Sequence, residues 1–209
     1  MEIIIVSDNQ FYLHAFTNIN CSMMITPDLA FDINYSVYDS AIVIISVSNN
    51  HTMLNILEGI IKKNTITVFI EPTQWSKRIK LTNIYNIYIL PSKMHLHFLM
   101  ETIRKSISSQ CDCVRIRPEK IQGSEWSTML HLMSGISNRN LAPMLKSSEK
   151  TISGRLISLS MKTGLSKLNK AKQLNAIYLY YLIYILSKPA EEKIYYRKQC
   201  KDILEFVRK

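Results

Sequence analysis

Hydrophobic residues in the first half of the chain form short continuous runs separated by amphipathic segments. The runs are rich in isoleucine and valine and do not alternate with polar residues, which indicates strands covered on both faces. We predict strands over 2–8, 39–48, 65–72 and 84–92, with a weaker one over 31–39. Apolar residues three and four apart predict helices over 10–19, 53–63 and 96–107. This alternation predicts a doubly wound, parallel α/β sheet of about five strands over residues 1–108.

The pattern changes after residue 108. Residues 109–121 contain charged residues, a proline and no periodicity, so we predict a linker. Residues 122–209 have helical periodicity throughout, with breaks near Gly135, 146–148, Gly164 and Pro189. We therefore expect an all-α domain over 122–188 and a C-terminal helical extension over 189–209.

A short helix followed by a tight turn and a longer helix lies within this second domain. Ser137 is placed to cap the short helix and Ser148 to cap the longer one. In the longer helix, Ile152, Leu156 and Leu159 form one apolar stripe, which leaves a basic and polar face directed outward. Two interpretations remain open on this pattern alone: a helix-turn-helix that reads DNA, and a helical bundle with a solvated polar face.

The net charge of +10 is confined to the second half of the chain. Residues 1–108 hold 8 Lys and Arg against 8 Asp and Glu, whereas residues 109–209 hold 18 against 8. Such asymmetry indicates two modules with different partners, the second of them suited to a polyanion. The five histidines show neither triad nor metal-ligand spacing, so we expect no enzyme activity, no cofactor and no metal.

The order of residues in "SNRNLAPMLKSSEKTIS" (137–153) and its flanks resembles the DNA-binding domain of the LuxR/NarL (FixJ) family of bacterial transcription regulators. The resemblance covers residues 121 to about 175 and includes capping, turn and core positions. The matching positions are Glu125, Met129, Gly135, Ser137, Asn138, Leu141, Ala142, Leu145, Ser148, Lys150, Thr151, Ile152, Leu159, Lys162, Gly164, Leu165 and Ala171.

The resemblance implies a cytoplasmic, nucleoid-associated regulator that binds double-stranded DNA. Its implied DNA-binding residues are Ser137, Asn138, Arg139, Lys150, Thr151, Ser153, Gly154, Arg155, Ile157, Ser158 and Lys162. Several of them depart from the family: Ser153 stands where a base-contacting lysine is usual, and Ile157 replaces a commonly polar residue. Gly154 inside the longer helix and Pro143 inside the shorter one lower helix stability.

Family members often carry an N-terminal receiver domain, and "YILPSKMHLHFLMETIRKSIS" (88–108) resembles its last strand and helix. A working receiver needs a carboxylate cluster for Mg²⁺ and an aspartate that accepts the phosphoryl group. Here the corresponding positions are Ser7, Asp8, Ser46 and Lys93, with Ser46 at or near the acceptor position. We therefore expect a degenerate receiver that is not phosphorylated, similar to the auxiliary regulators of capsule and fimbriae.

The segment 174–186 is strongly apolar but, at 13 residues, too short to span a bilayer, so we expect no membrane association. Its helical stripe consists of Leu174, Ile177, Tyr181, Tyr184 and Ile185. We predict that this stripe forms a dimer interface, in a homodimer or a heterodimer with a related regulator. The alternative is that residues 189–209 fold back over it. An alternative function also stays open: a regulator that sequesters a partner regulator without binding DNA.

Overall fold

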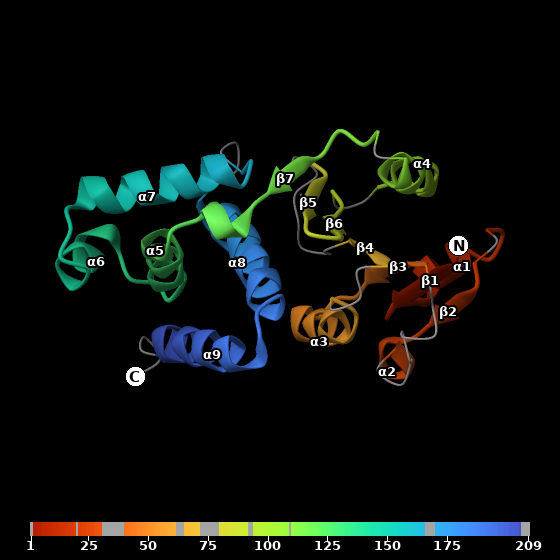
Figure 1. The fold of residues 1–209 in the computed structure, drawn as a ribbon, viewed down its shortest axis with the longest axis horizontal. Coiled ribbons are helices and arrows are strands. Elements are labelled where there is room, and N and C mark those ends of the chain that lie inside the picture. Colours follow the sequence, from red (N-terminus) through yellow and green to blue (C-terminus); the bar gives the residue numbers. More distant parts are fainter. Residues whose placement is uncertain are drawn as a thin grey trace. The chain divides into compact units, whose positions relative to one another are not determined.

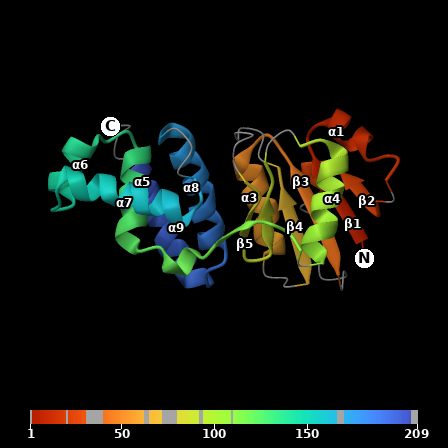
Figure 2. The same ribbon diagram turned by 90° about the horizontal axis from the view of Figure 1, so that it is seen from above.

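The computed structural model describes residues 2–19, 21–30, 40–61, 65–71, 80–91, 94–108, 110–165 and 170–205. The chain divides into two compact units, Met1–Arg115 and Ile116–Lys209. Figures 1 and 2 show the elements of each unit. The predicted weak strand at 31–39 and the candidate pocket residue Lys93 lie outside the described residues.

The first unit contains a mostly parallel sheet of seven strands. The strands are β1 (Glu2–Ser7), β2 (Met23–Ile25), β3 (Ala41–Ser46), β4 (Ile66–Ile70), β5 (Thr82–Ile84), β6 (Ile87–Ile89) and β7 (Val114–Ile116), in the spatial order β2-β1-β3-β4-β6-β5-β7. β1 pairs in parallel with β2 and β3, β3 with β4, and β4 with β6. The doubly wound α/β prediction is confirmed.

Helices cover both faces of this sheet. α1 (Gln10–Ala15) and α4 (Leu96–Ile107) lie on one face, and α2 (Pro27–Ala30) and α3 (Asn50–Ile60) on the other (Figure 1). Phe16, at the end of α1, shares one buried cluster with Leu99 and Ile103 of α4 and with Ile44 and Phe69 of the sheet. β3 is buried along its whole length, as its unbroken apolar run predicts.

One strand prediction and the linker prediction need correction. The expected strand over 84–92 is divided, because Ile84 ends β5 and Ile87 begins β6, and the two strands pair antiparallel. Tyr85 in the turn between them adopts φ 57°, a conformation that ends a strand. The segment 109–121, predicted to be a linker, contains β7 and a 3₁₀ helix, η2 (Pro118–Lys120). The Val114 N–H donates to the Leu81 carbonyl (2.9 Å), which fixes β7 at the sheet edge.

The second unit is helical. It contains α5 (Gly123–Met133), α6 (Asn138–Met144), α7 (Glu149–Lys162), α8 (Lys170–Leu186) and α9 (Ala190–Glu205). The predicted breaks are where the helices end: Gly135 (φ 92°), Lys146 (φ 46°) and Gly164 (φ 69°) all have left-handed backbones. Pro143 lies inside α6, and the helix continues past it to Met144.

The predicted dimer stripe on α8 is buried inside this unit, which corrects our expectation. Leu174, Ile177, Tyr181 and Ile185 are at most 8% exposed, and Tyr184 is half-buried. α8 packs against α5, α9 and η2, so it is buried on nearly every side. The prediction was wrong because it underestimated how much of the α8 stripe α9 covers. The C-terminal extension folds back on α5 and α8, and these stripe residues form the core.

Candidate nucleic-acid interface

α6 and α7 form a helix pair joined by a four-residue turn, 145–148. Ser137 caps α6, its Oγ accepting from the Asn140 N–H (3.3 Å). Ser148 caps α7, its Oγ accepting from the Thr151 N–H (3.1 Å). Both caps were predicted from the sequence. Ile152 and Leu159 are fully buried, which fixes the face of α7 that packs on the unit, whereas Leu156 of the predicted stripe is only half-buried.

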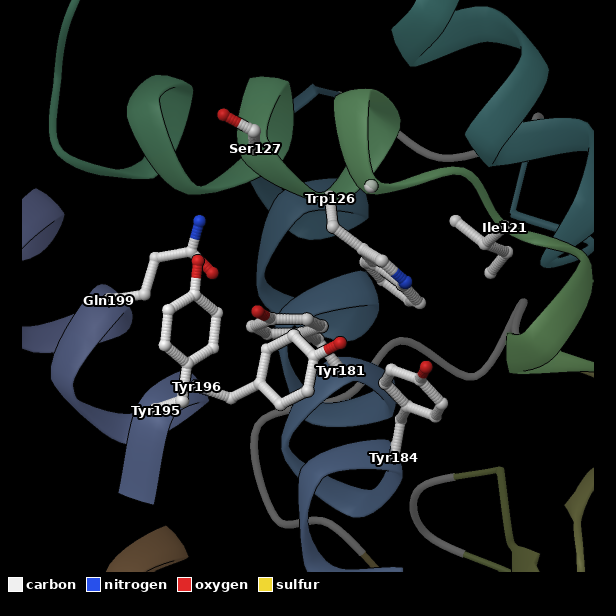
Figure 3. Close-up of a pocket in the computed structure, with 9 residues that line it drawn as sticks. Ile121, Trp126, Ser127, Tyr181, Tyr184, Tyr195, Tyr196 and Gln199 are labelled. Atoms are coloured by element: carbon white, nitrogen blue, oxygen red, sulfur yellow. The ribbon is translucent and has the colours of Figure 1, made fainter. Parts of the chain in front are cut away.

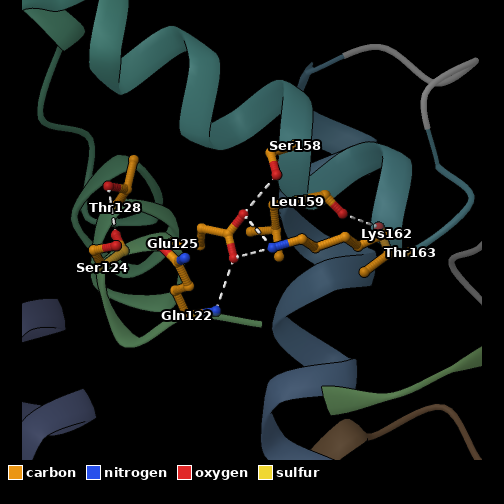
Figure 4. A network of polar contacts seen from close by, with 8 residues as sticks. All are labelled: Gln122, Ser124, Glu125, Thr128, Ser158, Leu159, Lys162 and Thr163. Carbon is orange, nitrogen blue, oxygen red and sulfur yellow. Dashed lines mark hydrogen bonds and ion pairs between the residues drawn. The ribbon is translucent and has the colours of Figure 1, made fainter. Parts of the chain in front are cut away.

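A buried carboxylate holds α7 against α5. Glu125, 4% exposed, accepts hydrogen bonds from the Gln122 N–H (2.8 Å) and the Ser158 hydroxyl (2.7 Å). The Lys162 ammonium completes the network, with Nζ 2.6 Å from Oε2 and 2.8 Å from Oε1 (Figure 4). Burial alone would raise the pKa of Glu125, but these hydrogen bonds outweigh it and hold the pKa below its usual range. Glu125 therefore stays ionised and links the two helices.

This network corrects two of the predicted DNA-binding residues. The Ser158 hydroxyl and the Lys162 ammonium are turned toward Glu125, where they anchor α7 to α5. The sequence assigned them to the outer face because both are polar and lie outside the apolar stripe. It could not show that a carboxylate 33 residues away from Ser158 is buried beside them.

Other predicted residues tie the helix pair together. The Asn138 amide donates to the Ser153 hydroxyl (3.1 Å), which links α6 to α7, and Asn138 Oδ1 accepts from Lys170 Nζ (3.4 Å). The Arg155 guanidinium donates to the Ser147 hydroxyl in the turn (3.3 Å). These contacts fix the angle between the two helices, which decides how a groove could receive α7.

The remaining predicted residues form an exposed surface. Arg139, Lys150, Thr151 and Gly154 are exposed, and Ile157 is 61% exposed. Sequence reasoning missed Met161, which is 69% exposed. Its position four residues after Ile157 could have revealed it, since residues four apart share a helix face. We call Lys150, Gly154, Ile157 and Met161 the outer stripe of α7.

At the carboxyl ends of the first unit's strands, the predicted pocket residues Ser7, Ser46 and Asp8 all make hydrogen bonds within the protein. The Ser7 hydroxyl donates to the Ser46 carbonyl (2.7 Å), and the Asp8 carboxylate accepts from the Ser48 N–H (2.8 Å) and hydroxyl. Burial, reinforced by the negative charge of Glu71, raises the pKa of Tyr12 nearby, so its phenol is neutral. Within the described part of the chain, no three His, Cys, Asp or Glu side chains gather into a possible metal site.

Comparison with known proteins gives a match of fold. Two solved structures resemble the chain: one of two RcsB dimers bound to two parallel DNAs, and one of the two-component response regulator RcsB in complex with DNA. Each has a TM-score of 0.53, and they cover 86% of this chain and 98% of their own, at 15% and 16% identity. The chain has the response-regulator fold. No family model matches it, and no curated protein matches it. None of the described helices has the length and hydropathy to cross a membrane.

Proposed function

We propose that this chain is a transcription regulator that binds double-stranded DNA through α7. The observation that carries the proposal is the one-sided anchoring of this helix. Its inner side is held by Ile152, Leu159 and the Glu125 network, while Lys150 and Thr151 in its first turn are exposed. A cation and a hydroxyl at this position can reach phosphates, and the outer stripe can enter a major groove.

Two further facts support this proposal. The +10 charge lies entirely in residues 109–209, the half that contains the helix pair, and such a surface attracts the phosphate backbone. The similar solved structures are of RcsB with DNA. Binding to two half-sites as a homodimer, or as a heterodimer with a related regulator, remains part of the proposal, since one helix pair alone makes a small interface with DNA. In this proposal the dimer surface is not the α8 stripe, because that stripe is buried within the second unit.

The regulator acts, in this proposal, without phosphorylation. A serine stands at the end of β3 where a receiver carries its acceptor aspartate, and Ser46 is buried there. The Asp8 carboxylate is occupied by Ser48. A hydroxyl at this position does not form the acyl phosphate that a carboxylate forms, so the input signal must reach the protein by another route.

The test is selection of DNA from a random duplex library by the purified full chain. We expect a shared sequence to be enriched by the wild type and by Lys201→Ala, an exposed α9 variant. Ile157→Gln should enrich a different sequence, because its side chain would present hydrogen-bonding groups to the base edges in place of an apolar contact. Failure of the wild type to enrich any sequence would overturn sequence-specific binding.

A second candidate function is sequestration of a partner regulator without DNA binding. The exposure of both Ile157 and Met161 favours it, because two large apolar side chains on one exposed helix face are typical of a protein interface. A chain that binds no DNA but forms a stable complex with a second regulator, lost in Ile157→Gln, would support this function over the first.

A further inference from the structure

A pocket of about 300 Å³ lies within the second unit, between α5, α8 and α9. Five aromatic rings line it: Trp126 from α5, Tyr181 and Tyr184 from α8, and Tyr195 and Tyr196 from α9 (Figure 3). Its size lies at the lower end of the range for small-molecule sites, and such sites are built mainly from aromatic and apolar walls. The pocket depends on α9, the extension beyond the helix pair.

The aromatic residues that line the pocket differ in exposure. Trp126 and Tyr181 are almost fully buried and pack together with ring centroids 4.8 Å apart, and Tyr184 lies nearly parallel to the Trp126 indole at 6.1 Å. Tyr196 meets Tyr181 edge to face at 6.5 Å. Tyr195, in contrast, is 65% exposed. The pocket thus has a buried aromatic floor and one exposed ring at its edge.

The polar group of the floor is not available to a ligand. The Trp126 indole N–H is buried, and within the described residues no acceptor reaches it. An indole N–H is a donor only, and leaving a buried donor unpaired costs free energy. No water-sized atom can touch this N–H, so a molecule in the pocket does not hydrogen-bond to it. At the rim, Ser127 and Gln199 add a hydroxyl and an amide.

The charges in and around the pocket disfavour a cationic ligand. An aromatic cage can bind ammonium groups, but the lining residues include no Asp or Glu. The Lys188 ammonium already lies over the Tyr184 ring, 4.8 Å from its centroid. The strongly positive second half of the chain would also repel a further cation.

We infer that this pocket binds a small, planar, uncharged aromatic molecule that carries a hydrogen-bond acceptor. Its ring would stack among the tyrosines, and its acceptor would pair with the Ser127 hydroxyl or the Gln199 amide at the rim. Trp126 adjoins Glu125, the α5 residue that anchors α7. A ligand in the pocket would therefore act on α5 and, through it, on α7, the proposed DNA-reading helix. This regulatory consequence rests on the proposed function, whereas binding itself does not.

The experiment is ligand-observed NMR and calorimetry on the full chain with three probes and no DNA. Naphthalene-2-carboxamide, which has a flat ring and a neutral acceptor, should bind saturably. Cyclohexanecarboxamide, which lacks the flat ring, and 2-naphthyltrimethylammonium, which is cationic, should bind far more weakly. Equal binding of all three, tighter binding of the cation or no binding of naphthalene-2-carboxamide would overturn the inference. Because DNA is absent, none of these outcomes depends on the proposed function.

Two variants locate the site. Tyr195→Ala removes the exposed ring at the pocket and should weaken binding of naphthalene-2-carboxamide roughly fivefold. Ile194→Ala is the matched control, since Ile194 adjoins Tyr195 on α9, is similarly exposed at 71% and does not line the pocket. Ser127→Phe should fill the pocket and abolish binding, with circular dichroism to verify folding. Equal affinities in Tyr195→Ala and Ile194→Ala would place any binding elsewhere and contradict the assignment.

Discussion

Removal of the Lys162 ammonium tests how α7 is held. Lys162→Met leaves the Glu125 carboxylate buried, 4% exposed, with its cation gone. Breaking a buried ion pair in this way costs about 3–5 kcal/mol. The Lys162 side chain is 35% exposed, and water screens the pair from that side, so we expect about 3 kcal/mol, the lower end of this range. The second unit should lose that much free energy of unfolding.

Urea unfolding followed by tryptophan fluorescence measures this loss in the full chain. The chain has two tryptophans, so a Trp75→Phe background leaves Trp126, which packs on Tyr181, to report on the second unit alone. With a slope of about 1.5 kcal/mol per M urea, Lys162→Met should lower the midpoint by about 2 M. Glu192→Gln, which removes an ion pair from a carboxylate that is 50% exposed, is the matched control and should cost less than about 1 kcal/mol.

The loss should also depend on pH. The pKa of Glu125 is lowered in the folded state, so its stabilisation is present above the unfolded value of about 4.3 and disappears as pH falls through the folded value. The difference between wild type and Lys162→Met should therefore be largest near pH 7 and shrink below about pH 4. A midpoint for Lys162→Met equal to that of Glu192→Gln, or a difference that stays constant down to pH 3, would refute the reasoning.

Three further outcomes follow from other parts of the structure. Ser148→Ala should lower the free energy of unfolding of the second unit by about 1 kcal/mol in the same assay, because it removes the N-cap of α7. Ser124→Ala, on α5, should have a smaller effect, since Ser124 accepts the Thr128 hydroxyl through its backbone carbonyl, which the substitution keeps. Gly154→Ala should raise the free energy of unfolding of the second unit by up to about 1 kcal/mol, since an added Cβ meets nothing within 4 Å. An unchanged or lower free energy of unfolding would be inconsistent with open space at this position. Incubation with acetyl phosphate and Mg²⁺ should leave the intact mass unchanged, and an acid-labile adduct in residues 1–108 would argue against a degenerate receiver.

Local sequence signals determined most of the fold. The uninterrupted isoleucine and valine runs identified β1, β3 and β4, and the serines at 137 and 148 identified the starts of α6 and α7, because strand burial and helix capping act over a few neighbouring residues. β2 has three residues, and its pairing with β1 depends on the sheet rather than on its own pattern, so it escaped prediction.

Long-range packing limited prediction of the candidate site. Periodicity placed Ser158 and Lys162 on the polar face of α7, but their direction depends on Glu125, which reaches them from another helix. The width of the α8 stripe indicated an interface, yet α9 covers it within the same unit. In both cases the missing information was which element packs on which, and residue spacing within one helix does not contain it.

The measurement that tests DNA binding by α7 most directly is the salt dependence of affinity for a fluorescent duplex. Fluorescence anisotropy of the full chain, Lys150→Ala and the control Lys201→Ala should be followed over a series of salt concentrations. We predict saturable binding by all three proteins, with a slope of log affinity against log salt that is smaller by about 0.9 in Lys150→Ala, as expected when one phosphate contact is lost. Absence of saturable binding, or an identical slope in Lys150→Ala and wild type, would contradict the account.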